Sequence, residues 1–359
     1  MKKLVFPIIQ IYLLVFSLVF TSCDNGEDST SFNRSEILIG IAMPDTSAER
    51  WTKDGNALKN AALELGYKVE LVFADGNQSD QNTKIQALIT QGVKLLILTN
   101  IDTGITPVVT EAKNKGITII AYDRLILDTG DYDYYITFNN DKVGQMQGQV
   151  IVDALDLTTP KNIALFAGAP SDNNAKFFFN GAMKILEPYI ESNMLVPIEG
   201  SNFLDTVIEF WWPDGDHDRM DTIFNGSSSI DAVLAPNDYI ARYIINNYFS
   251  SKTIPVITGQ DAEFESAKYI KSGKQTMTVF KDTISFAKNA ISIADQILEG
   301  KAINISGIIL ATGALEEMGD TGVKTVKTYL MDPKVINQNN LQDLIDTDWF
   351  TPEQKEELE

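Results

Sequence analysis

Polar side chains recur at the ends of apolar segments along this sequence, and their types suit one kind of ligand. The set is made up of Arg50, Asp123, Arg124, Asp172, Asn174, Asn237, Asp261 and Lys281. It holds three cations, three carboxylates and two amides. Each hydroxyl group donates one hydrogen bond and accepts two, and planar Arg, Asp and Asn groups bind neighbouring hydroxyls in pairs. We therefore expect a neutral ligand that carries many hydroxyl groups.

Two tryptophans near this set offer an apolar surface for such a ligand. Trp211 lies in the segment FWWP at residues 210–213, and Trp51 directly follows Arg50. An aromatic ring packs on the apolar C–H face of a sugar. Trp51 is a second candidate for stacking, with burial in the core as the competing interpretation. Asp and Asn at strand ends also serve as helix caps, whereas Arg124 and Lys281 are not explained in that way.

Residue counts exclude several reaction classes. The chain has one cysteine, Cys23, and one histidine, His217. A Ser/His/Asp or Cys/His triad would need His217 as its base, and a zinc site of His and Cys ligands cannot be assembled. No G-x-G-x-x-G or phosphate-binding loop motif is present, so nucleotide binding lacks support. We expect no catalytic residue, no metal and no cofactor.

Length, composition and charge describe an acidic globular protein. The chain has 359 residues, of which 44% are hydrophobic and 22% charged, as in ordinary globular proteins of two or three domains. Lys and Arg number 29 against 49 Asp and Glu, and the formal net charge is −20. Nucleic-acid binding needs a basic surface that neutralises phosphates. We therefore expect no nucleic-acid partner.

The first residues form a targeting segment. Lys2 and Lys3 precede an apolar run at residues 4–20, which indicates a signal peptide over residues 1–22. The following Cys23 resembles the lipidated residue of a bacterial lipoprotein, held to the membrane by its lipid chains; an ordinary signal peptide or anchor helix is the alternative. Residues 23–35 are predicted to be a lipid-anchored tether. This places the protein in the periplasm or cell envelope, outside the cytoplasmic membrane.

Strand and helix patterns alternate through the rest of the chain. Apolar runs at residues 37–43, 69–75, 94–100, 117–123, 134–140, 162–168, 232–238, 255–261 and 275–281 are separated by helical patterns. Continuous apolar runs are typical of parallel strands buried on both faces, and this spacing indicates βαβ units. The fold class is α/β with two consecutive parallel sheets. Ligands bind beyond the carboxyl ends of such strands, where the polar set lies.

Seven short motifs carry a family resemblance that runs from residue 37 to at least 281. They are AERWTKDG (48–55), AYDR (121–124), TFNNDKVG (137–144), GAPSDNNA (168–175), APND (235–238), TGQDAE (258–263) and TMTVFKD (276–282). In order and spacing the chain resembles the periplasmic sugar-binding proteins of ABC importers, in the xylose and multiple-sugar (aldose) branch. The resemblance implies a type I periplasmic binding protein fold, in which two Rossmann-like lobes are joined by three crossings. The expected lobes are residues 36–139 with 283–311, and 140–282 with 312–359.

The resemblance also implies the site and its partners. Matching motif positions give the pyranose contacts as Arg50, Asp123, Arg124, Asp172, Asn174, Trp211, Asn237, Asp261 and Lys281. The spacing to Pro213 selects Trp211 rather than Trp212. The implied ligand is a monosaccharide, an aldopyranose such as xylose or glucose. The implied partner is an ABC permease, to which the closed lobes deliver the sugar.

Two other functions remain open at this point. A secreted glycoside hydrolase would take an acid and a nucleophile from Asp123, Asp172 and Asp261. Each of these carboxylates is expected near a cation, which lowers its pKa and disfavours a general acid. A sugar sensor would use the same closure but would be read by a chemoreceptor or a sensor kinase.

Overall fold

The first element that the structure describes is a short 3-10 helix at Arg34–Glu36. The structure is a computed structural model that describes residues 32–47, 49–215, 217–226 and 229–359, so the predicted signal peptide and Cys23 lie outside it. The chain divides into the units Met1–Asn33 and Arg34–Glu359. Arg34 forms ion pairs with Asp295 and Glu299, both at 2.6 Å. These pairs fasten Arg34 to the second unit, so the tether predicted for residues 23–35 extends too far.

The first sheet has seven strands in the order β11-β12-β5-β4-β3-β1-β2. The strands are β1 (Leu38–Met43), β2 (Lys68–Phe73), β3 (Leu95–Leu98), β4 (Thr118–Tyr122), β5 (Tyr134–Phe138), β11 (Ile309–Leu310) and β12 (Lys327–Met331). All neighbours run parallel except β11 and β12. β3 is buried along its whole length, as expected for a strand covered on both faces.

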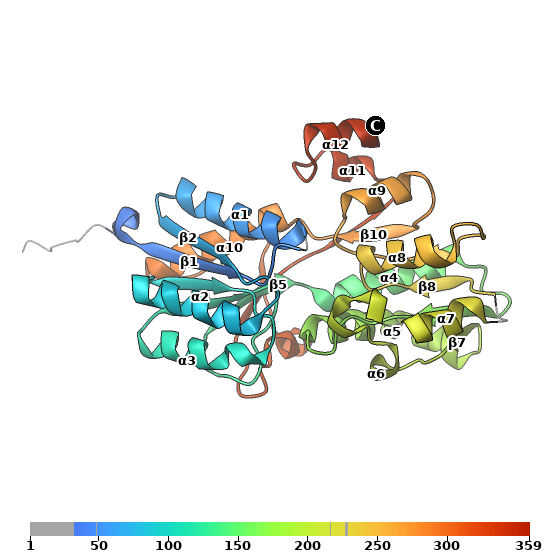
Figure 1. The fold of residues 1–359 in the computed structure, drawn as a ribbon, viewed down its shortest axis with the longest axis horizontal. Coiled ribbons are helices and arrows are strands. Elements are labelled where there is room, and N and C mark those ends of the chain that lie inside the picture. Colours follow the sequence, from blue (N-terminus) through green and yellow to red (C-terminus); the bar gives the residue numbers. More distant parts are fainter. Residues whose placement is uncertain (1–31, 48, 216, 227–228) are drawn as a thin grey trace, which may run out of the picture. The chain divides into compact units, whose positions relative to one another are not determined.

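Helices cover both faces of this sheet. They are α1 (Glu49–Glu64), α2 (Gln78–Gln91), α3 (Thr106–Asn114) and α10 (Thr283–Leu298). α1 and α10 lie together on one face, and α2 and α3 on the other (Figure 1). On the first face the ring of Phe286 lies 4.5 Å from that of Tyr122 and 4.7 Å from that of Phe138. On the other, Ile85 and Leu88 join the buried cluster around Leu96.

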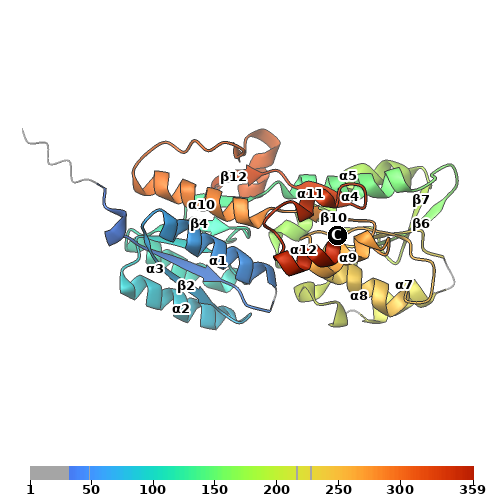
Figure 2. The same cartoon turned by 90° about the horizontal axis from the view of Figure 1, so that it is seen from above.

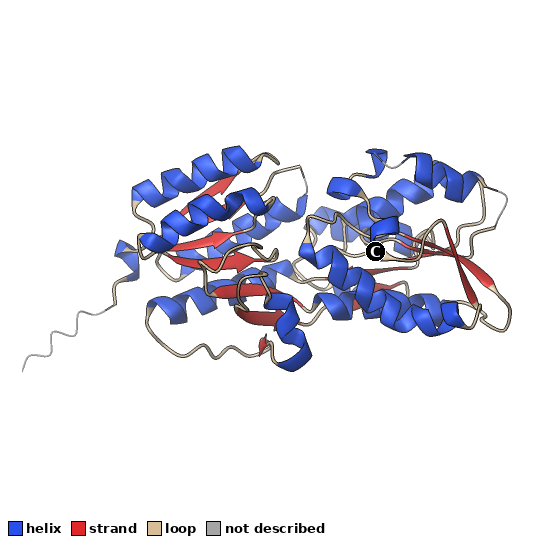
Figure 3. Cartoon of the chain, turned by 90° about the horizontal axis from the view of Figure 1, so that it is seen from below, coloured by secondary structure: helices blue, strands red, loops and turns tan. Residues whose placement is uncertain are grey.

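The second lobe is built on a parallel sheet of four strands in the order β7-β6-β8-β9. They are β6 (Lys161–Leu165), β7 (Leu195–Ile198), β8 (Ala232–Leu234) and β9 (Val256–Ile257). A separate antiparallel pair joins β10 (Met277–Phe280) to β13 (Lys334–Asn337). Figure 3 shows these strands in red among the helices that cover them.

The helices of the second lobe begin mostly at the carboxyl ends of its strands. They are α4 (Asn140–Ala154), α5 (Asn173–Glu191), α6 (Phe203–Thr206), α7 (His217–Asn225), α8 (Asp238–Tyr248), α9 (Phe264–Lys271), α11 (Gln342–Ile345) and α12 (Pro352–Leu358). The two-lobe α/β fold agrees with the predicted class. No helix of the described residues is both long and apolar enough to span a bilayer.

Glycines allow α4 and α5 to pack closely. A Cβ atom on Gly144 would lie 1.9 Å from the carbonyl oxygen of Phe178, and one on Gly181 would lie 2.1 Å from that of Asp141. Only glycine therefore permits this approach of the two helices. The first turn of α4 is thereby held beside the first turn of α5, where two of the predicted site residues lie.

The chain passes three times between the two lobes, and the third crossing differs from the prediction. The first two lie between β5 and α4 and between β10 and α10. The third lies between Met331 and Lys334, since β12 pairs with β5 in the first sheet while β13 pairs with β10. The prediction placed all of residues 312–359 in the second lobe, which is wrong for β12. Its Leu330 is fully buried, so apolar burial on the edge of the first sheet holds it there.

Candidate functional site

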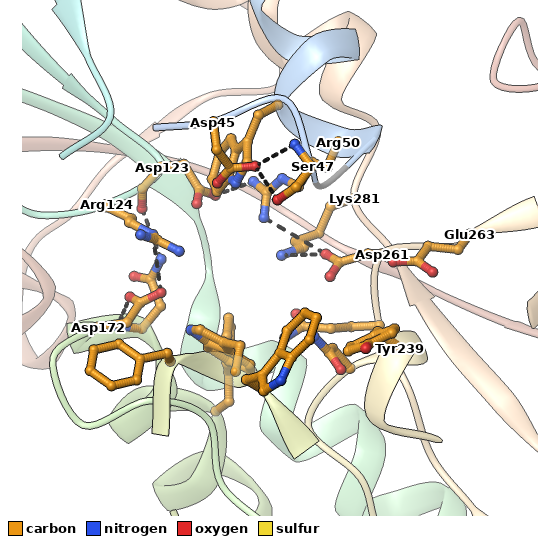
Figure 4. A pocket seen from close by; sticks show the side chains of 18 of the residues that line it. Asp45, Ser47, Arg50, Asp123, Arg124, Asp172, Tyr239, Asp261, Glu263 and Lys281 are labelled. Atoms are coloured by element: carbon orange, nitrogen blue, oxygen red, sulfur yellow. Dashed lines mark hydrogen bonds and ion pairs between the residues drawn. The ribbon is translucent and has the colours of Figure 1, made fainter. Parts of the chain in front are cut away.

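All nine predicted sugar-binding residues line one pocket, and Trp51 lines it with them. The pocket has a volume of about 570 Å³ and receives side chains from both lobes. Its predicted members are Arg50, Asp123, Arg124, Asp172, Asn174, Trp211, Asn237, Asp261 and Lys281. Figure 4 shows how the charged members face a common space. The structure thus brings together residues that are spread over more than half of the sequence.

Strand ends and helix starts position these side chains. Arg50 lies in the first turn of α1, and Asp123 directly follows β4. Asp172 and Asn237 are the N-caps of α5 and α8. Lys281 directly follows β10. The site therefore lies where the carboxyl ends of the strands of both lobes meet, as is typical of open α/β sheets.

A cluster of two cations and two carboxylates lies on one side of the pocket. Arg50 forms a hydrogen-bonded ion pair with Asp123, and its Nη1 lies 3.7 Å from Asp261 Oδ1. The Nζ of Lys281 lies 2.9 Å from the same oxygen of Asp261. Figure 4 shows Arg50 and Lys281 reaching Asp261 from two directions. Asp261 therefore compensates two cations, one of them from the first lobe.

Arg124 forms a second ionic contact between the lobes. Its Nε lies 3.2 Å from Asp172 Oδ2, and its Nη1 donates to the carbonyl oxygen of Asn100 at 3.3 Å. Asp172 also accepts a hydrogen bond from the backbone N–H of Asn174 at 3.0 Å. Asp172 therefore caps α5 with one oxygen and faces Arg124 with the other, and its contact with a sugar stays a prediction.

Trp51 lies under the two guanidinium groups. The guanidinium carbon of Arg50 lies 4.6 Å from the ring centroid and that of Arg124 lies 5.3 Å from it. The Trp51 side chain is buried. Both distances are typical of cation–π contacts. In this structure Trp51 therefore supports the two arginines, and its predicted stacking on a ligand stays a prediction.

Asp123 is kept ionised by its neighbours. Burial raises the pKa of this carboxyl, but the charges of Arg50, Lys281 and Arg124 outweigh burial and hold its pKa below the usual value. A carboxylate held ionised accepts hydrogen bonds and does not act as a general acid.

Two of the site aspartates have a left-handed backbone conformation. The backbone φ is +63° at Asp123 and +93° at Asp261. Such conformations are uncommon for residues other than glycine and gather at functional sites.

The side chain of Asn174 is occupied by protein partners. Its Nδ2 donates to the carbonyl oxygen of Asp123 at 2.9 Å. Its Oδ1 accepts from Asn140 Nδ2 at 2.7 Å and from the Tyr135 hydroxyl at 3.2 Å. The close packing of α4 on α5 brings Asn140 and Asn174 together. In this structure Asn174 ties the second lobe to the loop that carries Asp123.

Trp211 and Trp212 face different surroundings. The ring of Trp211 packs on Gly168, where a Cβ atom would lie 2.1 Å from it, and stands edge-on to Phe178 with centroids 6.4 Å apart. Trp212 is 57% exposed. Both tryptophans line the pocket, and the choice of Trp211 as the sugar contact stays a prediction. Asn237 uses its Oδ1 to cap α8 through the N–H of Ile240 at 2.9 Å, so its amide N–H₂ is the group left for a ligand.

Several residues at the site were not predicted. The pocket is also lined by Asp45, Ser47, Phe178, Phe210, Trp212, Tyr239, Arg242, Gln260 and Glu263. Gln260 lies within the TGQDAE motif, and its buried Oε1 has no hydrogen-bond partner among the described residues. Its position beside Asp261 is the signal that could have found it. Residues 210 and 212 flank Trp211 in the FWWP segment, and residue 239 follows the APND motif, so the same kind of signal was present for the aromatic residues.

Asp54 is a further buried carboxyl group next to the site. It is fully buried, and its Oδ2 lies 3.5 Å from Arg50 Nε, one helical turn away on α1. Burial raises the pKa of Asp54 to about 6, although the charge of Arg50 opposes the rise. Spacing by four residues on a helix brings two side chains together, and this spacing could have revealed the contact with Arg50.

Comparison with known proteins places the chain among binding proteins. Residues 39–302 match the family described as periplasmic binding protein domain. The chain is 40% identical to the multiple sugar-binding periplasmic protein SbpA of Azospirillum brasilense, over 88% of this chain and 90% of that protein. It is 35% identical to the D-xylose-binding periplasmic protein of Escherichia coli, over 89% and 92%.

A solved structure has the same fold. An ABC transporter solute-binding protein from Clostridium phytofermentans with bound β-D-glucose superposes with a TM-score of 0.81 and is 34% identical. The match covers 89% of this chain and 99% of that one.

Proposed function

The chain belongs to the periplasmic binding protein domain family, and on that premise we propose that it binds a monosaccharide and delivers it to an ABC permease. The proposed ligand is an aldopyranose such as xylose or glucose, and the proposed location is the periplasm or cell envelope. Relatives described as binding multiple sugars and D-xylose support the ligand class. The observation that carries the proposal is the convergence of all nine predicted residues on one pocket between the lobes.

The charges of the pocket suit a neutral ligand. Arg50, Arg124 and Lys281 face Asp123, Asp172 and Asp261, so within this set of six side chains three positive charges balance three negative ones. Paired ions present oriented donors and acceptors to hydroxyl groups without attracting a charged molecule. Each of these six side chains, together with Trp211 and Asn237, is assigned a direct sugar contact. Asn174 is assigned a positioning role because its amide is already bonded.

Closure of the two lobes accompanies binding in this proposal. The contacts Arg50–Asp261 and Arg124–Asp172 join side chains of different lobes. A sugar that bonds to members of both pairs interacts fully only when the lobes are together. A ligand shifts a conformational equilibrium by its difference in affinity for the two states. The sugar therefore favours the closed form, which the permease would recognise.

The chain is not an enzyme. Its family consists of binding proteins, and its relatives are described as binding proteins or receptors. The lowered pKa of Asp123, in which the nearby cations outweigh burial, agrees with a hydrogen-bond acceptor and not with the general acid that glycoside hydrolysis requires.

A thermal-shift screen tests the sugar class. Residues 33–359, refolded to remove any carried sugar, are heated with each of about twenty aldoses and sugar acids, and hits are measured by calorimetry. A ligand at 100 times its Kd stabilises the folded state by about 2.7 kcal/mol, a shift of a few degrees at this size. We expect a shift with at least one pentose or hexose and none with glycerol. A folded sample that responds to no monosaccharide would refute the proposal.

We propose that Cys23 carries a lipid anchor, and membrane fractionation of the full chain tests this. The Cys23→Ser variant should appear in the soluble fraction, whereas the neighbouring Ser22→Ala variant should stay with the membrane. Retention of both variants would refute lipidation at Cys23.

A second experiment identifies the partner. Proteins that bind the anchored chain in the presence of its sugar are captured and identified. A permease supports delivery, and a chemoreceptor or sensor kinase in its place would support sensing.

A further inference from the structure

Three aromatic side chains form a rim at the mouth of the pocket. This aromatic rim consists of Phe210, Trp212 and Tyr239, all of which line the pocket. Phe210 is 82% exposed and Trp212 is 57% exposed. The rings of Trp212 and Tyr239 lie 6.0 Å apart, inclined by 37°. None of the three is among the residues assigned to the monosaccharide, so the rim is an unassigned part of the cavity.

The backbone of the loop directs these rings outward. Phe210 and Trp211 both have left-handed conformations, with φ of +54° and +61°. Two consecutive non-glycine residues in this region are unusual, and such strain persists where the surrounding structure holds it in place. Trp211 packs inward on Gly168, while its neighbours on both sides are exposed. The loop thus supplies one inner ring and two outer rings to the same cavity.

The rim stays exposed although the lobes are in contact. Arg50 reaches Asp261 and Arg124 reaches Asp172 across the site in this structure. An open cleft therefore does not account for the exposure of Phe210 and Trp212. The cavity of about 570 Å³ lies within the range of roughly 300–1,000 Å³ that is usual for small-molecule sites. The aromatic rim and the charged cluster line this same cavity.

Polar groups accompany the rim, as a sugar ring would require. Arg242 forms a hydrogen-bonded ion pair with Glu263 and donates to Ser266 Oγ at 2.8 Å. Both members of the ion pair line the pocket, and Asp45 of the first lobe lines it as well. Figure 4 shows Tyr239 and Glu263 at the same edge of the cavity. Aromatic faces together with charged acceptors and donors match the two kinds of surface of a pyranose.

From this arrangement we propose that the aromatic rim is a second sugar subsite, which binds the adjoining ring of a disaccharide whose terminal aldopyranose occupies the inner pocket. The inference rests on the proposed monosaccharide site and extends it to longer ligands. Trp212 and Phe210 supply the stacking surfaces, and the Arg242–Glu263 pair supplies hydrogen-bond partners for hydroxyl groups. The protein would accordingly bind the terminal part of an oligosaccharide as well as the free monosaccharide.

Calorimetry with matched sugars tests the second subsite. Xylose is compared with xylobiose, and glucose with cellobiose, maltose and gentiobiose, on the wild-type domain and on the Phe210→Ala/Trp212→Ala variant. We expect one disaccharide to bind at least as tightly as its monosaccharide. The double variant should lower that affinity at least tenfold while the monosaccharide affinity changes less than twofold. The Phe210→Tyr/Trp212→Phe variant, which keeps the rings, should restore disaccharide binding.

Leu204→Ala is the matched control, because Leu204 is 73% exposed on the same lobe and does not line the pocket. Monosaccharide binding without binding of any disaccharide would overturn the second subsite and leave the proposed function intact. Disaccharide binding that the double variant and Leu204→Ala change equally would overturn it as well. Absence of binding for every sugar would instead refute the monosaccharide site on which the inference rests.

Discussion

Replacing Asp261 by alanine is expected to weaken sugar binding at least a hundredfold. Its carboxylate lies 2.9 Å from Lys281 Nζ and 3.7 Å from Arg50 Nη1, and Lys281 is almost fully buried. Truncating one member of a buried, hydrogen-bonded charge pair costs about 2–5 kcal/mol, partly because the other charge is left unpaired. Here the substitution leaves the buried Lys281 without its ion pair, while Arg50 loses its contact with Asp261 but keeps its pair with Asp123, so a loss of at least a hundredfold lies within that range.

Calorimetry of Asp261→Ala with the best sugar from the screen measures this loss. Asp343→Ala is the matched control, because Asp343 also pairs with a lysine, Lys334, at 2.8 Å, but both side chains are about half exposed. Exposed pairs contribute about 0–1 kcal/mol, and the control should bind sugar as the wild type does. An affinity loss under threefold for a folded Asp261→Ala protein would show that the site is misplaced.

Arg124→Ala should produce the second large loss, again about a hundredfold in affinity. The substitution removes the 3.2 Å contact with Asp172 Oδ2, which also joins the two lobes. It removes the guanidinium that rests on Trp51 as well. A buried carboxylate loses its partner, and the closed form loses one of its ionic contacts, so ligand binding and closure weaken together.

Arg124→Lys separates charge from geometry in the same measurement. Lysine keeps the positive charge but lacks the planar fork that bonds two groups at once, so we expect a loss of at least tenfold. Lys142→Ala serves as the control, because Lys142 forms an exposed pair with Asp332 at 2.8 Å. A wild-type affinity in Arg124→Ala would contradict the assignment of a direct sugar contact to this residue.

The positions of the site residues could be predicted because they depend on local patterns. Apolar runs and helical patterns alternate regularly from residue 37 to residue 298, and strands read from them agree with the described strands to within a few residues. In a parallel sheet the carboxyl ends of the strands lie at one edge. Arg50 and Asp123, which follow strands of the first sheet, therefore had to lie at the same edge, whereas the approach of Lys281 to them depends on contact between the lobes.

The lobe to which the segment 327–331 belongs could not be predicted, because it depends on contacts with distant parts of the chain. The segment 327–331 is short and could have joined either lobe. It pairs with β5 because the edge of the first sheet offers unpaired backbone groups and an apolar surface that buries Leu330. Such pairing joins residues almost two hundred positions apart, and it moved the third crossing from the predicted position to residues 331–334.

The roles of individual site residues were likewise decided by packing. Asn174 is bonded to Asn140 and Asp123 because glycines let α4 and α5 approach closely. Trp51 supports two guanidinium groups because the first turn of α1 lies beside the loop after β4.

The sequence by itself determined the α/β fold, the position of the pocket and the residue types that line it, because hydrophobic periodicity and strand-end geometry act over short distances. Only the tertiary structure decided which of those side chains are free for a ligand and which are held by the protein. That division depends on burial and on hydrogen-bond partners from distant parts of the chain. Contacts with distant parts of the chain likewise place the exposed rings of Phe210 and Trp212 at the mouth of the pocket.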